Sequence, residues 1–197
     1  MKKIVLSAVA ILAFGFANAQ DSTGGKGFAN GDVFISGSVG FTSEKTGDVK
    51  TSGFEVAPKV GFFVTDNIVL GGAIGFQGTT EDDGIGDDVK TNSISAGLFG
   101  RYYATPSSDF SVFGELGVNY ASSKVDNGVT EAKANGFNVV LAPGVSYFIS
   151  EHFALEAAIG VLGYSSVKPD VDGAESTNNF ELGLGLDDIT LGLVYKF

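Results

Sequence analysis

The last nine residues of the chain, 189–197, alternate strictly in side-chain type and end on an aromatic residue. Successive side chains of a β-strand point to opposite sides, so this alternation places five apolar side chains on one face. They are Ile189, Leu191, Leu193, Tyr195 and Phe197. A terminal strand with one continuous apolar face is uncommon in a water-soluble protein and favours a strand that faces lipid.

The first residues have the composition of an exported chain. Two lysines precede an apolar run at 4–16, and Ala-Asn-Ala at 17–19 forms a small-x-small cleavage site. We therefore predict a signal peptide at residues 1–19 and a loose, flexible periplasmic segment at 20–32. No later stretch approaches the roughly 18 to 20 continuous apolar residues of a helical span, so membrane insertion would have to be by strands.

Charge and cysteine content exclude several classes of protein. The formal net charge is -11, and removal of Lys2 and Lys3 with the signal peptide would change it to -13. Such an acidic chain is a poor partner for nucleic acid. The chain has no Cys, which excludes a lipid-attachment cysteine and a disulfide-stapled secreted scaffold.

Eight segments of about ten residues alternate in hydrophobicity, which matches the roughly 9 to 11 residues of a tilted transmembrane strand. They are 33–42, 54–64, 68–78, 93–104, 110–120, 137–148, 153–164 and 189–197. The connections between them alternate long and short, as in bacterial barrels with longer outer loops and short periplasmic turns. The sequence therefore predicts an all-β fold at residues 33–197, an eight-stranded antiparallel up-and-down transmembrane β-barrel.

The final segment has an unusual extension. Residues 180–186 already alternate before Asp187 and Asp188 shift the frame by one residue. A β-bulge there would join the two halves into one long strand, and an extension of 180–186 beyond the membrane is the rival interpretation. We interpret the segment as one bulged strand.

The outward faces carry aromatic residues near both strand ends and aliphatic residues or glycine between them, the pattern of two aromatic girdles. The charged residues fall on the inward faces instead. We predict a lumen network of carboxylates and cations made of Glu55, Lys59, Arg101, Glu115, Glu156 and Lys196. A plug in the periplasmic half would consist of Phe34, Phe63, Phe99, Tyr103, Phe113 and Phe148. An eight-stranded barrel leaves room only for side chains, so these residues predict a filled lumen rather than a pore.

No residue pattern predicts a catalytic, cofactor or metal site. The single histidine, His152, lies in an expected periplasmic turn without a second His, a Cys or a Ser motif nearby. The acidic loop at 79–91 offers carboxylates to a cation such as calcium, but its spacing differs from that of an EF-hand. A solvated acidic loop is the favoured interpretation, with cation binding left open.

The segments PGVSYF (143–148), FFVTDN (62–67) and LVYKF (193–197) resemble the small OmpA-like and OmpX-like eight-stranded barrels, the outer-membrane β-barrel domain family. The resemblance implies a location in the outer membrane of a Gram-negative cell, contact with outer-membrane lipid, and insertion by the barrel assembly machinery. It makes Tyr195 and Phe197 part of the assembly signal.

This resemblance favours a monomeric, non-enzymatic protein with a structural or surface-interaction role. Its extracellular loops would serve adhesion, contact with a host surface or extracellular ligand, or membrane integrity. A small pore or transporter of lipid or other hydrophobic compounds is the first alternative. An outer-membrane lipid-modifying enzyme is the second.

Overall fold

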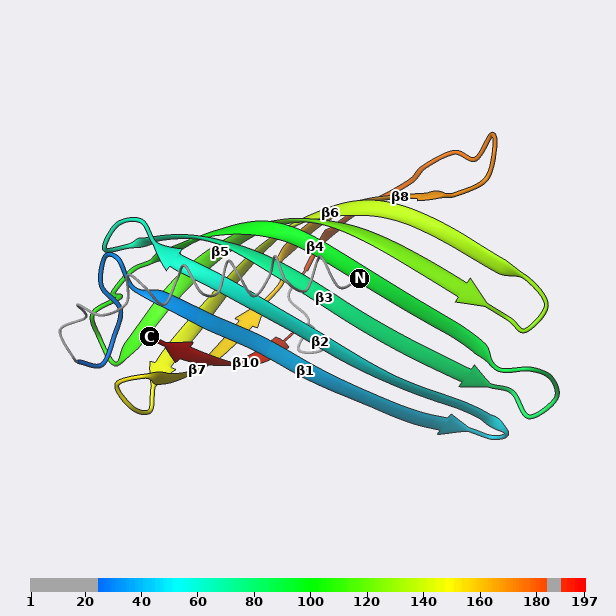
Figure 1. The fold of residues 1–197 in the computed structure, drawn as a ribbon, viewed down its shortest axis with the longest axis horizontal. Coiled ribbons are helices and arrows are strands. Elements are labelled where there is room, and N and C mark those ends of the chain that lie inside the picture. The colour runs from blue at the N-terminus through cyan, green and yellow to red at the C-terminus, as the bar shows by residue number, and fades with distance from the viewer. Residues whose placement is uncertain (1–24, 184–188) are drawn as a thin grey trace.

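The computed structural model describes residues 25–183 and 189–197, which form ten antiparallel strands (Figure 1). The strands are β1 (Val33–Thr46), β2 (Val49–Phe63), β3 (Ile68–Asp82), β4 (Val89–Tyr103), β5 (Phe110–Asp126), β6 (Glu131–Phe148), β7 (Phe153–Ile159), β8 (Leu162–Pro169), β9 (Thr177–Leu182) and β10 (Ile189–Lys196). A search of the described residues for a helix long and apolar enough to cross a membrane finds none.

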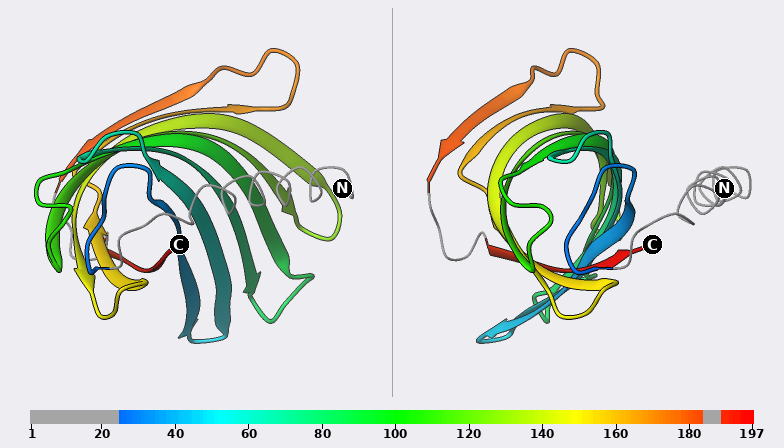
Figure 2. Two further views of the ribbon diagram at one scale, coloured as in Figure 1. Left: turned by 60° about the vertical axis from the view of Figure 1, so that its left-hand side comes forward. Right: turned by 90° about the vertical axis from the view of Figure 1, so that its left-hand side faces the viewer.

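The ten strands occupy eight strand positions around the barrel. Strands β1 to β6 pair in sequence as consecutive neighbours. Both β7 and β8 pair with β6, so they are successive parts of the seventh strand position. Strand β10 pairs with β7 and is the eighth strand of the ring, whereas β9 pairs with β8 alone among the described strands. Pairing of β1 with β10 closes the ring seen in Figure 2, and the predicted eight-stranded antiparallel barrel is confirmed.

The strands run further at the outer end than the hydrophobic pattern predicted. Strand β1 continues to Thr46 rather than 42, and β5 continues to Asp126 rather than 120. The added residues are mostly polar, because hydrophobic alternation marks only the lipid-facing part of a strand, whereas backbone pairing continues beyond it. The outer connections are therefore short tips on long hairpins. Each tip has a glycine with positive φ, a conformation that favours glycine: Gly47, Gly84, Gly128 and Gly173.

The chain around the eighth strand position is described only in part. Strand β9 pairs with β8 over residues 177–182, so residues 180–182 are in a strand. The predicted bulge at 187–188 lies outside the described residues, as does the predicted signal peptide. The β8–β9 hairpin diverges from the rest of the barrel wall in Figure 2.

The two faces of the wall differ sharply. Outward residues such as Leu98 and Leu191 are 73% and 70% exposed, whereas the inward neighbour Phe99 is 5% exposed. Outward aromatic residues at both ends are also exposed, among them Phe76 and Tyr120 near the outer end and Tyr102 near the periplasmic end. A continuous exposed apolar belt of this kind is unfavourable in water and suited to lipid. The hydrophobic core lies inside the barrel, near the short periplasmic turns.

Candidate functional site: the barrel lumen

The periplasmic half of the lumen is closed by a layer of aromatic rings. All six residues predicted as the plug are at most 5% exposed: Phe34, Phe63, Phe99, Tyr103, Phe113 and Phe148. They come from β1, β2, β4, β5 and β6. Tyr103 lies near the middle, with ring centroids 5.3 Å from Phe63 and 5.2 Å from Phe113. The structure therefore brings these residues together into one hydrophobic core. Within it, the Phe99 ring lies at the level of the lumen cations, with its centroid 5.4 Å from both Lys59 and Arg101.

A seventh aromatic residue, Phe28, joins this layer from the N-terminal segment. It is 2% exposed, and its ring centroid lies 4.7 Å from both Phe63 and Phe148. The predicted loose segment is thus ordered over residues 25–32. Its backbone is tied down as well, because the Phe28 amide donates to the Pro106 carbonyl at 2.7 Å and the Gly31 amide donates to the Phe63 carbonyl at 2.9 Å. The gain from burying one aromatic side chain explains this difference from expectation.

Glycines make room for the aromatic layer. Phe34 pairs across strands with Gly61, and Phe99 pairs with Gly71. A Cβ atom at either glycine would overlap the partner ring. Gly27, beside Phe28, has a φ of 97°, and a Cβ atom there would stand 2.6 Å from the backbone of Ser107, so it also cannot carry a side chain without strain. This pairing of an aromatic ring with an opposing glycine was visible in the sequence only once the strand register was known.

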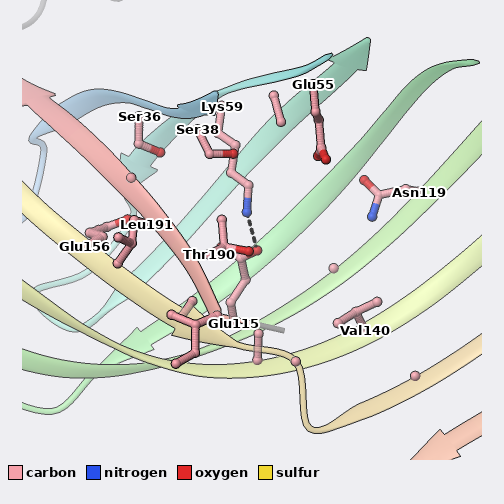
Figure 3. Close-up of a pocket in the computed structure, with 18 of the residues that line it drawn as sticks. Ser36, Ser38, Glu55, Lys59, Glu115, Asn119, Val140, Glu156, Thr190 and Leu191 are labelled. Carbon is pink, nitrogen blue, oxygen red and sulfur yellow. Dashed lines mark hydrogen bonds and ion pairs between the residues drawn. The ribbon is translucent and has the colours of Figure 1, made fainter. Parts of the chain in front are cut away.

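An ion cluster lies directly on the aromatic layer. Arg101 Nε donates to Glu115 at 2.5 Å, and Arg101 Nη1 donates to Glu156 at 2.8 Å. Lys59 Nζ donates to Glu115 at 2.6 Å (Figure 3). The Tyr103 hydroxyl donates to Glu156 at 3.0 Å. The Arg101 guanidinium stacks over the Phe113 ring at 4.3 Å. Two cations thus neutralise two carboxylates, as buried charges require.

Two residues of the predicted network lie outside this cluster. Glu55 faces the lumen on β2 nearer the outer end and makes no ion pair among the described residues. Lys196 Nζ donates to the carbonyls of Gly25 at 2.9 Å and Gly27 at 2.7 Å, and lies 3.9 Å from Asp32. The predicted counter-charge for the lumen carboxylates therefore holds the N-terminal segment instead, because β10 places Lys196 at the periplasmic rim.

Asp32, just before β1, is buried beside Lys196. Burial raises the pKa of the Asp32 carboxyl, while the hydrogen bond from the Ala29 amide and the charge of Lys196 partly offset this rise. Sequence reasoning missed Asp32 and Phe28 because both lie in a short polar, glycine-rich stretch. The one available signal was an isolated Phe within that stretch.

The outer half of the lumen is a cavity of about 870 Å³ above the ion cluster. Its wall carries small and polar inward residues, including Ser38, Asn119 and Thr190 (Figure 3). Asn138 also lines it. The barrel is therefore filled by side chains only in its periplasmic half. The predicted filling followed from the number of strands, whereas glycine, serine and alanine line much of the outer half and leave space there.

The surroundings of His152 and of the acidic loop indicate a structural role for both. His152 Nδ1 lies 3.1 Å from the Lys196 carbonyl in a periplasmic turn. In the acidic loop, Asp83 accepts hydrogen bonds from the amides of Ile85 and Gly86, which lower the pKa of its carboxyl. Across the described residues, no group of three or more His, Asp or Glu side chains is arranged to hold a metal ion.

The predicted assembly-signal residues lie together on the outer surface at the periplasmic rim. The Tyr195 ring centroid is 5.0 Å from that of Phe197 and 5.1 Å from that of Phe153. The Phe197 amide also donates to the Val33 carbonyl at 3.0 Å, next to the β1–β10 seam. This contact ties the end of the chain to the first strand.

Comparison with protein families decides the class of this barrel. The model of the outer membrane protein beta-barrel domain matches residues 6–197. The chain belongs to this family. As a member of the outer membrane protein beta-barrel domain family, it is located in the cell outer membrane, which confirms the predicted location.

Solved structures share the fold of this family member at low sequence identity. OprG of Pseudomonas aeruginosa is 16% identical, with a TM-score of 0.55 over 87% of this chain and 98% of OprG. The N-terminal β-barrel domain of Pseudomonas aeruginosa OprF is 14% identical, with a TM-score of 0.54 over 86% of this chain and all 100% of that domain. Neisserial surface protein A is 17% identical, with a TM-score of 0.50 over 84% of this chain and 97% of the Neisserial chain. No curated protein matches the sequence.

Proposed function

We propose that this outer-membrane barrel is a non-conducting anchor that presents its outer hairpins for contact with another surface. The proposal rests on three exposed apolar side chains at the hairpin tips. Ile85, Val129 and Val171 are 92%, 85% and 65% exposed. Each belongs to a different tip, far from the lipid-facing belt. Burying a fully exposed Ile or Val in a complex contributes roughly 1.5 to 3 kcal/mol.

The tips are held in defined conformations. The Val129 and Thr130 amides both donate to Asn127 Oδ1, at 3.1 and 2.8 Å. The Ile85 amide donates to Asp83 Oδ1 at 3.0 Å. Little conformational entropy would be lost when a partner covers these side chains, which favours binding.

Two of the tips form one continuous surface. A methyl group added at Gly128 would stand 2.6 Å from Cβ of Asp87, so the β5–β6 tip touches the β3–β4 tip. Ile85 and Val129 therefore belong to the same outer rim. The four tip regions at 44–50, 81–90, 124–133 and 168–175 carry twelve carboxylates and six lysines. A partner with apolar pockets and a basic rim would complement this surface.

A cell-adhesion assay tests the proposal. The double variant Ile85→Ser/Val129→Ser would be compared with Ile85→Val/Val129→Ile, which keeps the tips apolar, on cells that display equal amounts of barrel. We expect the serine variant to reduce adhesion to epithelial and matrix-coated surfaces at least fivefold and the conservative variant to retain it. Equal adhesion of both variants, or no difference from cells without the barrel, would reject a contact role for these tips.

The aromatic layer and ion cluster support a non-conducting lumen over the pore or transporter alternative. Planar-bilayer recording of purified protein tests this part of the proposal, because a stable conductance of porin size would contradict a sealed periplasmic half. A lipid-modifying enzyme receives no support from the arrangement of the described residues: His152 lies at the periplasmic end, and Glu115 and Glu156 are engaged in ion pairs.

Contact with outer-membrane lipid, insertion by the barrel assembly machinery through Tyr195 and Phe197, and a monomeric state are parts of the same proposal. The exposed apolar belt supports contact with lipid. The surface position of the Tyr195 and Phe197 rings supports their availability to an assembly factor.

A further inference from the structure

We propose that Asn127, at the tip of the β5–β6 hairpin, is a self-modification site, where the chain converts its own amide side chain into a carboxylate through a cyclic imide. The Gly128 backbone nitrogen attacks Asn127 Cγ and ammonia is released. Water then opens the imide to aspartate or isoaspartate. The proposal goes beyond the surface-contact function and does not depend on it.

The chain contains three Asn-Gly pairs, the dipeptide in which no side chain shields the attacking backbone nitrogen. The first begins at Asn30 in the N-terminal segment, the second at Asn127, and the third at Asn135 within β6. All three have the same residue types, so any difference in reactivity between them comes from the folded structure.

A carboxylate already holds the attacking nitrogen at the hairpin tip. The Gly128 amide donates to Asp126 Oδ1 at 2.9 Å. A carboxylate at this distance is placed to take the N–H proton as the nitrogen adds to Cγ. Gly128 has a φ of 80°, and a Cβ atom there would stand 2.6 Å from Asp87 Oδ2. The position therefore favours glycine, which leaves the nitrogen unshielded.

Three donors polarise the side-chain carbonyl of Asn127. Its Oδ1 accepts hydrogen bonds from the Val129 amide at 3.1 Å, the Thr130 amide at 2.8 Å and the Thr130 hydroxyl at 3.2 Å. The same donors stabilise the negative charge that develops on this oxygen when the nitrogen adds to Cγ. In the described part of the chain, Asn127 Nδ2 donates no hydrogen bond, so the leaving group is not held in place.

The reaction balances with water as the only co-reactant. The Gly128 N–H proton passes to the Asp126 carboxylate while the N–Cγ bond forms. The proton then passes to Asn127 Nδ2, the Cγ–Nδ2 bond breaks, and ammonia leaves. Water adds to one of the two imide carbonyls and opens the ring. The net reaction consumes one water and releases one ammonia, with no oxidation or reduction.

The other two Asn-Gly pairs lack this arrangement. The Gly31 amide donates to the Phe63 carbonyl at 2.9 Å, which is a neutral acceptor, and the Asn30 side chain accepts no hydrogen bond among the described residues. Asn135 and Gly136 pair with both β5 and β8. The Gly136 nitrogen therefore cannot approach the Asn135 side chain without loss of strand pairing.

The modification would change the outer rim. A carboxylate at position 127 adds a negative charge close to Asp126 and to Asp87, and like charges at this range repel each other. Isoaspartate also lengthens the backbone by one carbon, which disrupts the hydrogen bonds that hold Val129 and Thr130. The tip would thus lose its defined conformation as the protein ages.

Peptide mapping by mass spectrometry tests the inference on the folded barrel in detergent micelles. Trypsin separates the three Asn-Gly pairs into different peptides, because it cleaves after Lys26, Lys124 and Lys133. After incubation near neutral pH, we expect Asn127 to convert at least tenfold faster than the asparagine of either other pair. In the urea-unfolded chain the three rates should lie within threefold of one another. Isoaspartate should be among the products, because an imide opens on either side whereas direct hydrolysis of the amide gives aspartate alone.

A pair of variants tests the role of the carboxylate. Asp126→Asn keeps an oxygen that can accept the Gly128 hydrogen bond but removes the charge, so conversion of Asn127 should slow at least fivefold. Asp172→Asn removes an exposed carboxylate at the β8–β9 tip and should leave the rate unchanged. Heat-modifiable gel migration confirms that both variants fold, and fragment spectra assign the converted residue.

Equal rates at the three pairs in the folded barrel, equal rates in the two variants, or a product without isoaspartate would each overturn the proposal. Loss of adhesion in the tip variants would not, because Ile85→Ser/Val129→Ser keeps Asp126, Asn127 and Gly128.

Discussion

The periplasmic and outer halves of the lumen are lined by the same strands but by side chains of very different volume. Along β4 the inward residues are Tyr103, Arg101 and Phe99 in the periplasmic half, followed by Gly97 and Ser95 in the outer half. The inward residues of β5 show the same order: Phe113, Glu115, Gly117 and Asn119. Strand alternation decides which residues face inward. The gradient of side-chain volume along each strand decides where the barrel is filled and where it holds a cavity.

The two halves should therefore respond differently to substitution. In the periplasmic half every ring and charge has a close partner, so removal of one group leaves a cavity or an unpaired buried charge. In the outer half the inward side chains border open space and lose little when they change. This contrast can be measured from the free energy of unfolding in urea, with the barrel in lipid vesicles.

The largest effect is expected for Arg101→Ala. The substitution leaves Glu115 and Glu156 buried without their shared cation and removes the guanidinium from the Phe113 ring. Breaking a buried charge network by removal of one partner costs about 3 to 5 kcal/mol. We expect a loss of this size in the urea-unfolding free energy. Glu55→Gln in the outer half is the control, with an expected change below about 0.5 kcal/mol. Equal losses in the two variants would mean that the ion cluster is not what distinguishes the halves.

The second effect concerns the N-terminal segment. Phe28→Ala removes the ring that contacts Phe63 and Phe148 and leaves a cavity at the periplasmic mouth. Truncation of a buried Phe costs about 3 kcal/mol or more. We expect that loss together with faster proteolysis of the segment at Lys26. Asn30→Ala changes an exposed neighbour and should leave both quantities unaltered. A segment as protease-resistant in Phe28→Ala as in the parent chain would show that Lys196 and the backbone hydrogen bonds hold it without the Phe28 ring.

Two inward glycines give a matched comparison of the halves. Gly71→Ala forces a methyl group into the Phe99 ring and the Val60 carbonyl, whereas a methyl group at Gly117 meets only Asn119 Nδ2 at 3.6 Å. Overpacking costs about 1 to 3 kcal/mol, and replacement of an unstrained strand glycine by alanine gains about 0.5 kcal/mol. The two substitutions should therefore change the unfolding free energy in opposite directions. Destabilisation by both would show that the outer half is as tightly packed as the periplasmic half.

Much of this contrast could be predicted from the sequence, and the reasons for the rest are physical. Alternation placed Arg101, Glu115 and Glu156 inside the barrel, because a charge on the lipid face is unfavourable. It could not pair them, since Arg101 meets Glu156 only after β4 and β7 close around the lumen. The docking of Phe28 has no periodic signal at all, because one side chain in an irregular segment is fixed by tertiary packing alone.

The seam between β1 and β10 is a similar case. Among the described residues only 34–37 of β1 pair with β10, which is a property of register and not of residue type. Hydrophobic alternation at Val39 and Leu191 looks the same whether the seam beside them is paired or open.

The smallest expected effect is the pH dependence contributed by Asp32 at the periplasmic rim. Burial raises the pKa of Asp32 in the folded barrel above its ordinary value of 3.8. The folded state therefore binds this proton more tightly than the unfolded state, so protonation favours folding. This contribution is fully present below the unfolded pKa and is lost as the pH rises through the folded pKa. Asp32→Asn stays neutral and retains an oxygen that can accept the hydrogen bond from the Ala29 amide, so its stability relative to the parent chain should rise across that window. Urea midpoints of the two proteins, compared from about pH 3 to about pH 7, measure the difference. A difference that falls with rising pH would mean that attraction to Lys196 outweighs burial, and the rim would then depend on charge in the same way as the ion cluster above it.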